Sequence, residues 1–152
     1  MATLFISDLH LCTSRPQINR ILVDFLAGPA RQADALYILG DLFEYWAGDD
    51  DIDDPFNAGI VEALRSCAAQ VPVHLMHGNR DFLLGDSFAR TAAVRLIEDP
   101  VLIDCGGVPT LLTHGDALCT DDADYMQFRA EVQSKQWIEA FLATALPERK
   151  AK

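Results

Sequence analysis

The stretch Ala35-Leu-Tyr-Ile-Leu-Gly-Asp41 is a run of five apolar residues that ends in a glycine and an acid. A short apolar run bounded by turn residues is typical of a buried strand. Residues 3–7 and 71–77 have the same character, and two segments with helical periodicity separate the three runs. The order strand, helix, strand, helix, strand predicts right-handed crossovers and a parallel sheet, so the expected fold class is α/β.

The two intervening segments carry apolar residues at helical spacing. In the first, Ser14 is expected to cap the helix, with Gln17 three residues later, and Gly28-Pro29 to end it. The second extends over residues 56–68 and stops before Pro72. The stripes that cover one face of each helix are Ile18, Ile21, Leu22, Phe25 and Leu26 in the first and Phe56, Ile60, Val61, Leu64 and Ala68 in the second.

The second half of the chain has a less regular pattern. A helix is expected near residues 82–92, and the runs 101–104 and 108–113 flank Cys105-Gly-Gly107 as in a β-hairpin. This hairpin is expected to begin a second, more antiparallel sheet. From Asp122 the pattern is helical again, until Pro147 and a charged tail.

Length, charge and cysteine usage limit the class of protein. The chain has 152 residues, which suits one domain, and 12 Lys and Arg against 23 Asp and Glu, a net charge of −11. This balance argues against a nucleic-acid binder, because Lys and Arg hold phosphate backbones. No basic segment precedes the first apolar run, so no signal peptide is expected, and no run is long enough to span a membrane. The four cysteines form no C-x-x-C pair, which favours a reducing cytosol.

Polar side chains gather where the predicted strands end. Four short motifs occupy these positions: Asp8-Leu9-His10, Gly40-Asp41, Gly78-Asn79-Arg80-Asp81 and His114-Gly115-Asp116. Since ligands of parallel α/β sheets bind at the carboxyl ends of the strands, we expect the four motifs to line one crevice. The one-residue separation of Asp8 and His10 lets both side chains leave an extended backbone on the same side.

These side chains suit divalent metal ions. Carboxylates, imidazoles and an amide oxygen, without thiolates, favour Mn²⁺ or a similar ion over structural Zn²⁺. Asp41 has two carboxylate oxygens and can bridge two ions. Two ions about 4 Å apart can hold the attacking and leaving oxygens of a displacement at phosphorus and make hydroxide from water near neutral pH. Arg80 offers a two-pronged donor for phosphate oxygens.

The four motifs, in this order and spacing, resemble those of the calcineurin-like metallophosphoesterases. Within that superfamily, residues 6–12, 33–44, 77–85 and 114–122 resemble the UDP-2,3-diacylglucosamine diphosphatases, and the similarity extends to about Phe128. The resemblance implies an α/β/β/α sandwich, two Mn²⁺ ions and hydrolysis of the pyrophosphate of UDP-2,3-diacylglucosamine to lipid X and UMP in lipid A biosynthesis. It also implies a cytoplasmic enzyme that lies peripherally on the inner membrane.

The resemblance implies roles for particular residues as well. The expected metal ligands are Asp8, His10 and Asp41 for one ion, and Asp41, Asn79 and His114 for the other. The substrate phosphates are expected to contact Asn79 and Arg80, and the glucosamine part is expected to contact Asp122 and Tyr125. The residues expected to take part in catalysis are Asp41, Asn79, Arg80 and His114.

The chain departs from the family pattern at its C-terminal side. Family members continue through a helical insert to a Gly-His-x-His motif whose histidines complete the metal sites. The histidines here are His10, His74, His77 and His114, and no such motif occurs. We therefore expect a C-terminally truncated form. It would be a single metallophosphoesterase domain over residues 1–152, with the start of a helical insert from about residue 122 and a sandwich incomplete at the C-terminal side.

Arg80 bears on the type of reaction. Many relatives in the wider superfamily that cleave alkyl or aryl phosphate esters carry a histidine at this position, where it can serve as general acid. Arginine cannot give up a proton at working pH, so the leaving group must depart without help. A phosphate released from a pyrophosphate does so, because its pKa is about 6. The residue pattern therefore favours a pyrophosphatase over a protein phosphatase.

Two alternative functions stay open at this point. One is another calcineurin-like pyrophosphatase or phosphodiesterase that acts on a soluble nucleotide. The other is an inactive fragment or scaffold that keeps the fold and serves as an interaction module.

Several other residues have simpler structural interpretations. The acidic run 49–54 lacks the Gly and Glu that an EF-hand requires, which favours a solvated loop. His74 and His77 are expected to be structural or to support the ligands, and Asp121 and Asp122 can cap the following helix. Five apolar side chains near the motifs could line an acyl-chain groove, although core packing is the simpler expectation: Trp46, Phe82, Leu83, Leu84 and Phe128.

Overall fold

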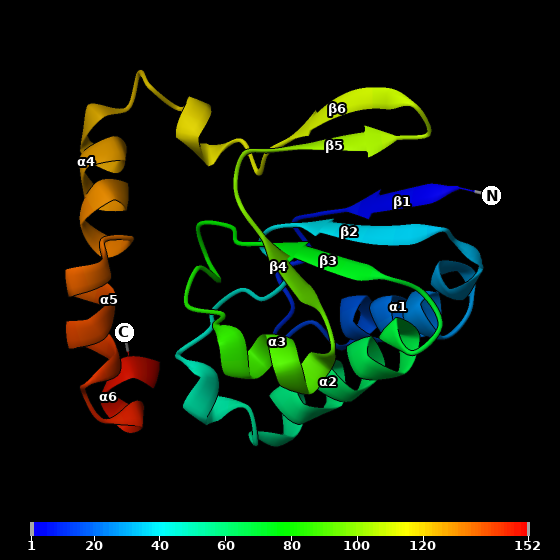
Figure 1. Cartoon of the computed structure of the whole chain (residues 1–152). Helices are drawn as coiled ribbons and strands as arrows, with labels where there is room; N and C mark the ends of the chain where they lie inside the picture. The colour runs from blue at the N-terminus through cyan, green and yellow to red at the C-terminus, as the bar shows by residue number, and fades with distance from the viewer. Residues whose placement is uncertain (1, 152) are drawn as a thin grey trace.

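The computed structural model of the protein describes residues 2–151 and contains two β-sheets. The first sheet has four parallel strands in the order β1-β2-β3-β4, with bounds Thr3–Ile6, Ala35–Leu39, Val73–Met76 and Arg95–Ile97. The second is an antiparallel hairpin of β5 (Val101–Cys105) and β6 (Val108–Leu112). The hairpin lies above the parallel sheet in Figure 1, so the sheets form adjacent layers. The predicted α/β class and the predicted hairpin are confirmed.

Helices cover the opposite face of the parallel sheet. Three of them, α1 (Pro16–Ala27), α2 (Pro55–Ala68) and α3 (Asp86–Ala92), lie side by side below the sheet in Figure 1. Short 3₁₀ helices are η1 (Pro29–Gln32), η2 (Asp49–Asp51) and η3 (Asp116–Leu118). In residues 2–151, no helix has both the length and the apolar character that crossing a membrane requires.

Three further helices form what we call the C-terminal arm, residues 123–150. They are α4 (Ala123–Val132), α5 (Lys135–Leu142) and α6 (Leu146–Lys150). The arm stands beside the two sheets rather than on a sheet face, at the end toward which β1, β2 and β3 point (Figure 1). The carboxyl ends of these strands therefore face the arm.

The core lies between the parallel sheet and its helices. Leu36, Ile38 and Leu75 of the sheet are fully buried in this core. An aromatic cluster fills the end near α3, where the Trp46 ring lies 4.8 Å from the Phe43 ring and 5.3 Å from the Phe88 ring. These large buried rings stabilise the segment that follows β2.

Two details of α1 differ from the prediction. The N-cap position is Arg15, without a side-chain cap, and the hydroxyl of Ser14 lies 3.1 Å from the sulfur of Cys12 instead. Pro16 in the first turn pre-sets the helical backbone without a cap. The buried stripe is also narrower, because Leu22 and Leu26 are buried while Ile21 is 63% exposed. How α1 docks, and not periodicity alone, decides which apolar residues it buries.

The segment after β3 also differs from the prediction. The helix expected over 82–92 begins only at Asp86, since residues 82–85 form a turn that leads to α3. The chain then forms β4, which pairs in parallel with β3 and was not predicted. Only three residues long and starting with an exposed arginine, β4 has no alternating pattern to reveal it.

The predicted charged tail after Pro147 is a helix instead. Pro147 lies in the first turn of α6, where its missing N–H costs no hydrogen bond. Arg149 in this helix is only 2% exposed. The tail is thus an anchoring segment, and the expectation that the helical pattern stops at Pro147 was wrong.

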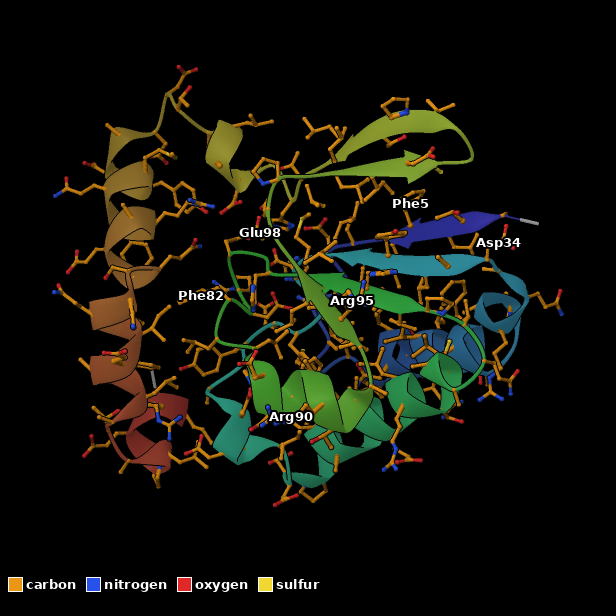
Figure 2. All side chains as sticks on the ribbon, viewed as in Figure 1. Phe5, Asp34, Phe82, Arg90, Arg95 and Glu98 are labelled. Carbon is orange, nitrogen blue, oxygen red and sulfur yellow. The ribbon has the colours of Figure 1, made fainter. Side chains whose placement is uncertain are left out.

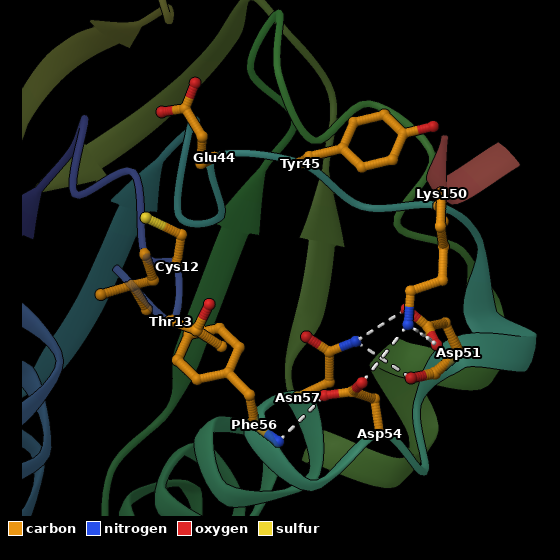
Figure 3. Close-up of a pocket in the computed structure, with 11 residues that line it drawn as sticks. Cys12, Thr13, Glu44, Tyr45, Asp51, Asp54, Phe56, Asn57 and Lys150 are labelled. Carbon is orange, nitrogen blue, oxygen red and sulfur yellow. Dashed lines mark hydrogen bonds and ion pairs between the residues drawn. The ribbon is translucent and has the colours of Figure 1, made fainter. Parts of the chain in front are cut away.

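The acidic run 49–54 is not the solvated loop that we expected. The Asp49 carboxylate accepts hydrogen bonds from the backbone N–H groups of Gly85 (3.0 Å) and Phe88 (2.9 Å) at the start of α3. Asp50 pairs with the guanidinium of Arg149. Asp51 and Asp54 pair with Lys150 at 3.1 and 3.3 Å (Figure 3). The acidic run therefore connects α3 and α6, two helices that lie far from it in the sequence.

Candidate metal centre

The loops after β1 and β2 place Asp8, His10 and Asp41 side by side. The Asp8 N–H donates to the Gly40 carbonyl (3.1 Å) and the His10 N–H to the Asp41 carbonyl (3.0 Å), so the loops run together beyond the strands. Each of these residues has a left-handed backbone conformation, with a φ of 57° at Asp8, 49° at His10 and 53° at Asp41. Such conformations are unfavourable for non-glycine residues and persist where the surroundings impose them. The extended backbone expected for residues 8–10 is therefore wrong, although the two side chains do meet.

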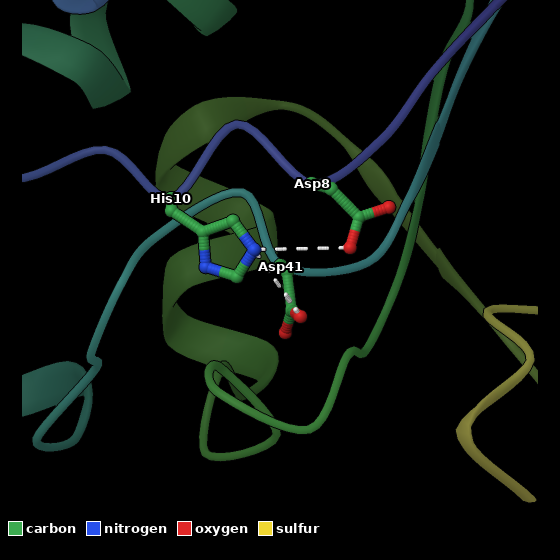
Figure 4. A group of neighbouring side chains, drawn as sticks. All are labelled: Asp8, His10 and Asp41. Carbon is green, nitrogen blue, oxygen red and sulfur yellow. Dashed lines mark ion pairs between the residues drawn. The ribbon is translucent and has the colours of Figure 1, made fainter. Parts of the chain in front are cut away.

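These three side chains form a cluster that can hold a cation. His10 Nε2 lies 3.8 Å from Asp8 Oδ1 and 3.7 Å from Asp41 Oδ2 (Figure 4). One ligand atom from each residue lies within 4.8 Å of the others. Two carboxylates and one imidazole are a hard to borderline donor set, which suits a divalent ion such as Mn²⁺.

His114 and Asn79 approach Asp41 from the other side. His114 Nε2 lies 3.2 Å from Asp41 Oδ2 and 2.9 Å from Asn79 Oδ1. The other ring nitrogen of His114 lies 2.8 Å from the carbonyl oxygen of Leu39, the last residue of β2. The structure thus brings all five predicted ligands to one rim, with Asp41 at its centre.

The charges around Asp41 perturb its pKa and that of His114. The hydrogen bond and charge of Asp41 outweigh burial and raise the pKa of His114 to about 9. Burial raises the pKa of Asp41, but the bonds from His114 and from the Arg80 N–H outweigh it, so the pKa of this carboxyl lies below its usual value. A proton therefore stands on His114 beside an ionised Asp41, where a cation can replace it.

Glycines allow the loops to approach this closely. A Cβ at Gly78 would clash with the backbone and carboxylate of Asp41, and one at Gly40 would clash with the ring of His114. Gly40 also has a φ of +96°, which L side chains rarely adopt. The close contacts of Gly40 and Gly78, which precede Asp41 and Asn79, therefore leave no room for a side chain at either position.

The comparisons agree with this geometry. The sequence profile of the calcineurin-like phosphoesterases matches residues 1–151. The chain belongs to this family. It is 54% and 53% identical to the UDP-2,3-diacylglucosamine hydrolases of Chromobacterium violaceum and Aromatoleum aromaticum, over 99% of this chain but 63% and 61% of theirs. The chain thus spans about three fifths of the length of the curated relatives it matches.

The comparison with solved structures gives a similar fold. The crystal structure of the Pseudomonas putida nuclease MPE superposes with a TM-score of 0.51 at 19% identity, over 66% of this chain and 49% of that one. The likeness concerns the fold alone. The predicted metallophosphoesterase fold is confirmed.

In this calcineurin-like chain, Asp81 has a role that we did not predict. Its fully buried carboxylate accepts backbone N–H bonds from Leu42 (2.8 Å), Gly78 (2.9 Å), Asp41 (3.2 Å) and Phe43 (3.3 Å). It therefore joins the loop that carries Asp41 to the loop that carries Asn79. Burial raises the pKa of Asp81 despite these bonds. Its place beside Arg80 in one motif was the only sequence signal, and an acid there is equally compatible with a solvated turn.

Arg80 lies at the rim as predicted, and Glu44 holds it there. The Arg80 N–H donates to Asp41 Oδ1 (2.8 Å), and its guanidinium donates to the Glu44 carboxylate (2.6 Å) and carbonyl (3.2 Å). The Arg80 side chain is 50% exposed, so it can reach a ligand. Glu44 belongs to residues 33–44, which carry part of the family resemblance, but no role was predicted for it.

Asp122 and Tyr125 lie on the hairpin side of the rim. A shallow cavity of about 380 Å³ is lined by both, together with Asn79 and His114. Asp122 also caps α4, accepting from the Tyr125 N–H at 2.9 Å, and the Tyr125 hydroxyl donates to Asp116 at 3.0 Å. The two predicted substrate contacts are therefore near the ligands, and the capping interpretation of Asp122 is confirmed as well.

Of the five apolar side chains that could line an acyl-chain groove, some lie in the core and the others line a cavity. Trp46, Leu83 and Leu84 are buried in the core. Phe82 and Phe128 instead line a cavity of about 290 Å³ between the rim and the arm. In Figure 2, Phe82 lies on the side of its loop that faces the arm, and its ring is 6.2 Å from that of Trp137.

The two other histidines have structural contacts, as expected. His77 Nε2 lies 2.5 Å from the Leu84 carbonyl oxygen, across the turn that follows β3. The His74 ring stacks on Tyr37 at 4.5 Å. Neither belongs to the cluster around Asp41.

Proposed function

We propose that the protein hydrolyses the pyrophosphate bond of UDP-2,3-diacylglucosamine, giving lipid X and UMP, in lipid A biosynthesis. The observation that supports this most is the convergence of five candidate ligands and Arg80 at one rim, in a chain about half identical to proteins named for this hydrolase activity. We also propose that residues 1–152 are one domain in which the arm begins a helical insert.

The donor set fits the metal ions that the family implies. Asp8, His10 and Asp41 would hold one Mn²⁺, and Asp41, Asn79 and His114 the other, with Asp41 between them. The raised pKa of His114 supports this, because the site already attracts a positive charge. Such ions, when bound, supply Lewis acidity and a nucleophilic hydroxide at neutral pH.

Arg80 would bind the phosphate groups and offset their charge in the transition state. Its guanidinium stands at the rim, and its backbone N–H is tied to Asp41, so it holds a fixed place relative to the ligands. It stays protonated and donates no proton to the leaving group. This suits a pyrophosphate, whose leaving phosphate has a pKa of about 6. Asn79 would contact the same phosphates.

The cavity between the rim and the arm supports a lipid substrate. It begins at Asn79 and Arg80 and continues along the apolar side chains Phe82, Phe128, Val132, Trp137 and Phe141. A diphosphate bound at the rim would place an attached acyl chain against this apolar wall. Asp122 and Tyr125, on the other side of the ligands, would contact the glucosamine. A lipid-linked substrate also supports a peripheral position on the cytoplasmic face of the inner membrane.

The test measures metal content and substrate choice together. The 152-residue chain, loaded with Mn²⁺ and passed through gel filtration, is assayed for bound metal and for cleavage of UDP-2,3-diacylglucosamine in mixed micelles and of UDP-glucose in solution. We expect bound Mn²⁺ and cleavage of the lipid substrate alone. Arg80→Ala should lower turnover by at least about a hundredfold with metal content unchanged, as expected for a group that stabilises transition-state charge. Asp41→Asn should lose both metal and turnover.

The control variant is Arg90→Ala, an exposed arginine of α3 whose guanidinium contacts only Ser87 in the described structure. It should leave both readouts unchanged. Equal cleavage of the soluble nucleotide would favour the pyrophosphatase or phosphodiesterase alternative. A chain without bound metal and without hydrolysis would favour the inactive scaffold.

A further inference from the structure

Glu44 lies between a candidate metal ligand and the candidate phosphate-binding residue. Its Oε2 is 3.0 Å from His10 Nδ1, and its Oε1 is 2.6 Å from Arg80 Nη2. The backbone of Glu44 is fixed as well, because its N–H donates to the Leu11 carbonyl at 3.0 Å and its own carbonyl accepts from Arg80 Nε. One carboxylate thus faces two functional side chains with one oxygen each.

We propose that Glu44 is a positioning residue that selects the metal-binding tautomer of His10 and orients Arg80. This inference rests on the proposed function and deepens it. His10 Nδ1 is buried and makes no aligned hydrogen bond to any described atom. Glu44 Oε2, 3.0 Å away, is an acceptor within reach of a proton on this nitrogen. A proton held on Nδ1 leaves the lone pair on Nε2, the nitrogen that faces Asp8 and Asp41.

The same contact prepares His10 as a ligand. Metal-bound histidines commonly donate their second ring N–H to a carboxylate, which fixes the ring and increases its basicity. Without Glu44, the neutral imidazole can place its proton on Nε2, directed at the carboxylates of the cluster. That tautomer has no lone pair for a metal ion on this side.

Glu44 accepts two hydrogen bonds from the Arg80 guanidinium. The Nε and Nη2 groups donate to Glu44, while Nη1 makes no hydrogen bond to residues 2–151. The free Nη1 group and the half-exposed guanidinium remain available for a phosphate oxygen. A simple surface ion pair would require only one of the two carboxylate oxygens.

Substitutions of Glu44 separate these roles. A glutamine has one acceptor and one donor, so Glu44→Gln keeps the contact with either His10 or Arg80 but not both. Glu44→Asp keeps both acceptors on a shorter side chain. Glu139→Gln is the matched control, because among residues 2–151 the Glu139 side chain pairs only with Lys135, on the exposed surface of α5.

The decisive measurement is the tautomer of His10, read from ¹⁵N shifts of the imidazole in the metal-free 152-residue chain at about pH 10, well above the ordinary pKa of an imidazole. A His10→Gln variant assigns the signals. We expect the Nδ1–H tautomer in the unsubstituted chain and in Glu139→Gln, and a shift toward Nε2–H in Glu44→Gln. An Nε2–H tautomer in the unsubstituted chain would overturn the proposal even if every Glu44 variant failed to fold.

A second readout follows the metal. Glu44→Gln should weaken Mn²⁺ binding by about ten- to a hundredfold, as loss of a carboxylate behind a ligand histidine does, and Glu44→Asp should recover part of this loss. An unchanged tautomer and an unchanged affinity in Glu44→Gln would overturn the assignment. Because the tautomer needs neither metal nor substrate, a failure of the proposed hydrolase function would leave this result standing on its own.

Discussion

The rim of the parallel sheet and the C-terminal arm are held in place by different kinds of interaction. At the rim, backbone hydrogen bonds join neighbouring loops, and the buried carboxylate of Asp81 collects four N–H groups. The arm is joined to the rest of the molecule through side chains, chiefly the ion pairs of Arg129 with Asp116 and Arg149 with Asp50 and the packing of Phe141 in the core. The rim is therefore fixed by main-chain geometry, and the arm by side-chain contacts that can be removed one at a time.

This difference separates two parts of the proposed site. The candidate metal ligands all lie at the rim, whereas the arm contributes one wall of the apolar cavity through Phe128, Trp137 and Phe141. Loosening the arm should alter the cavity and leave the ligands where they are. Loosening the rim should disturb both.

The strongest test of the rim is Asp81→Ala. The substitution leaves four N–H groups without an acceptor in a buried place, and each unsatisfied group costs about 1–3 kcal/mol. We expect the free energy of unfolding to fall by at least about 4 kcal/mol, the lower end of the sum over the four groups, measured by urea denaturation. Asp81→Asn, which retains one acceptor oxygen, should give an intermediate loss.

The control for Asp81→Ala is Asp53→Ala, since Asp53 is an exposed acid of the η2–α2 connection. It should change the free energy of unfolding by about 0.5 kcal/mol or less. An Asp81→Ala protein as stable as the Asp53→Ala protein would show that the rim does not depend on this carboxylate.

The next largest effect is expected from Arg149→Met in the arm. The Arg149 side chain is 2% exposed and donates to Asp50 and to the carbonyls of Ala47 (2.6 Å) and Thr144 (3.1 Å). Asp50 can return to solvent, but the carbonyls lose a donor, so we expect a loss of about 1–3 kcal/mol that is confined to the arm. Hydrogen exchange should become faster in α5 and α6 and stay unchanged in β1, β2 and β3.

Arg90→Met provides the matched comparison, because Arg90 is exposed and bonds only Ser87 among the described residues. Exchange in the arm should be the same in this variant as in the unsubstituted chain. If Arg149→Met accelerated exchange in the sheet as much as in the arm, the two regions would form one cooperative unit and the contrast drawn above would be wrong.

The rim was largely predictable from the sequence, since it depends on local patterns. Short apolar runs ending in Asp8, Asp41 and Asn79 define strands, and the rule that parallel strands share a carboxyl edge brings their ends together. His114 joins them through the strand that precedes it. The left-handed backbones of Asp8, His10 and Asp41, which set the distances among these side chains, were not predicted.

The parts that could not be predicted depend on partners far away in the sequence. Asp50 and Arg149 are 99 residues apart, and neither an acidic run nor a basic tail indicates that they meet. The full burial of Asp81 and the exposure of Ile21 likewise depend on how finished elements dock. Periodicity identifies the apolar face of a helix but does not say how much of that face the neighbouring elements will cover.

The smallest expected effect concerns the arm at acid pH. The hydrogen bond from Arg149 outweighs burial and lowers the pKa of Asp50 below its usual value of 3.8. The resulting stabilisation of the docked arm is present above that value and is lost as the pH falls through the lowered pKa. It is modest, because the Asp50 side chain is 57% exposed and solvent screens the pair.

Fluorotryptophan labelling reports on both regions at once, because Trp46 lies in the core near the rim and Trp137 in the arm. As the pH falls below about 4, the ¹⁹F signal of Trp137 should move before that of Trp46. Asp50→Asn should make the Trp137 signal less dependent on pH, and Asp53→Asn should not. Simultaneous movement of both signals, or an unchanged Trp137 titration in Asp50→Asn, would mean that the Arg149–Asp50 pair does not control the docking of the arm.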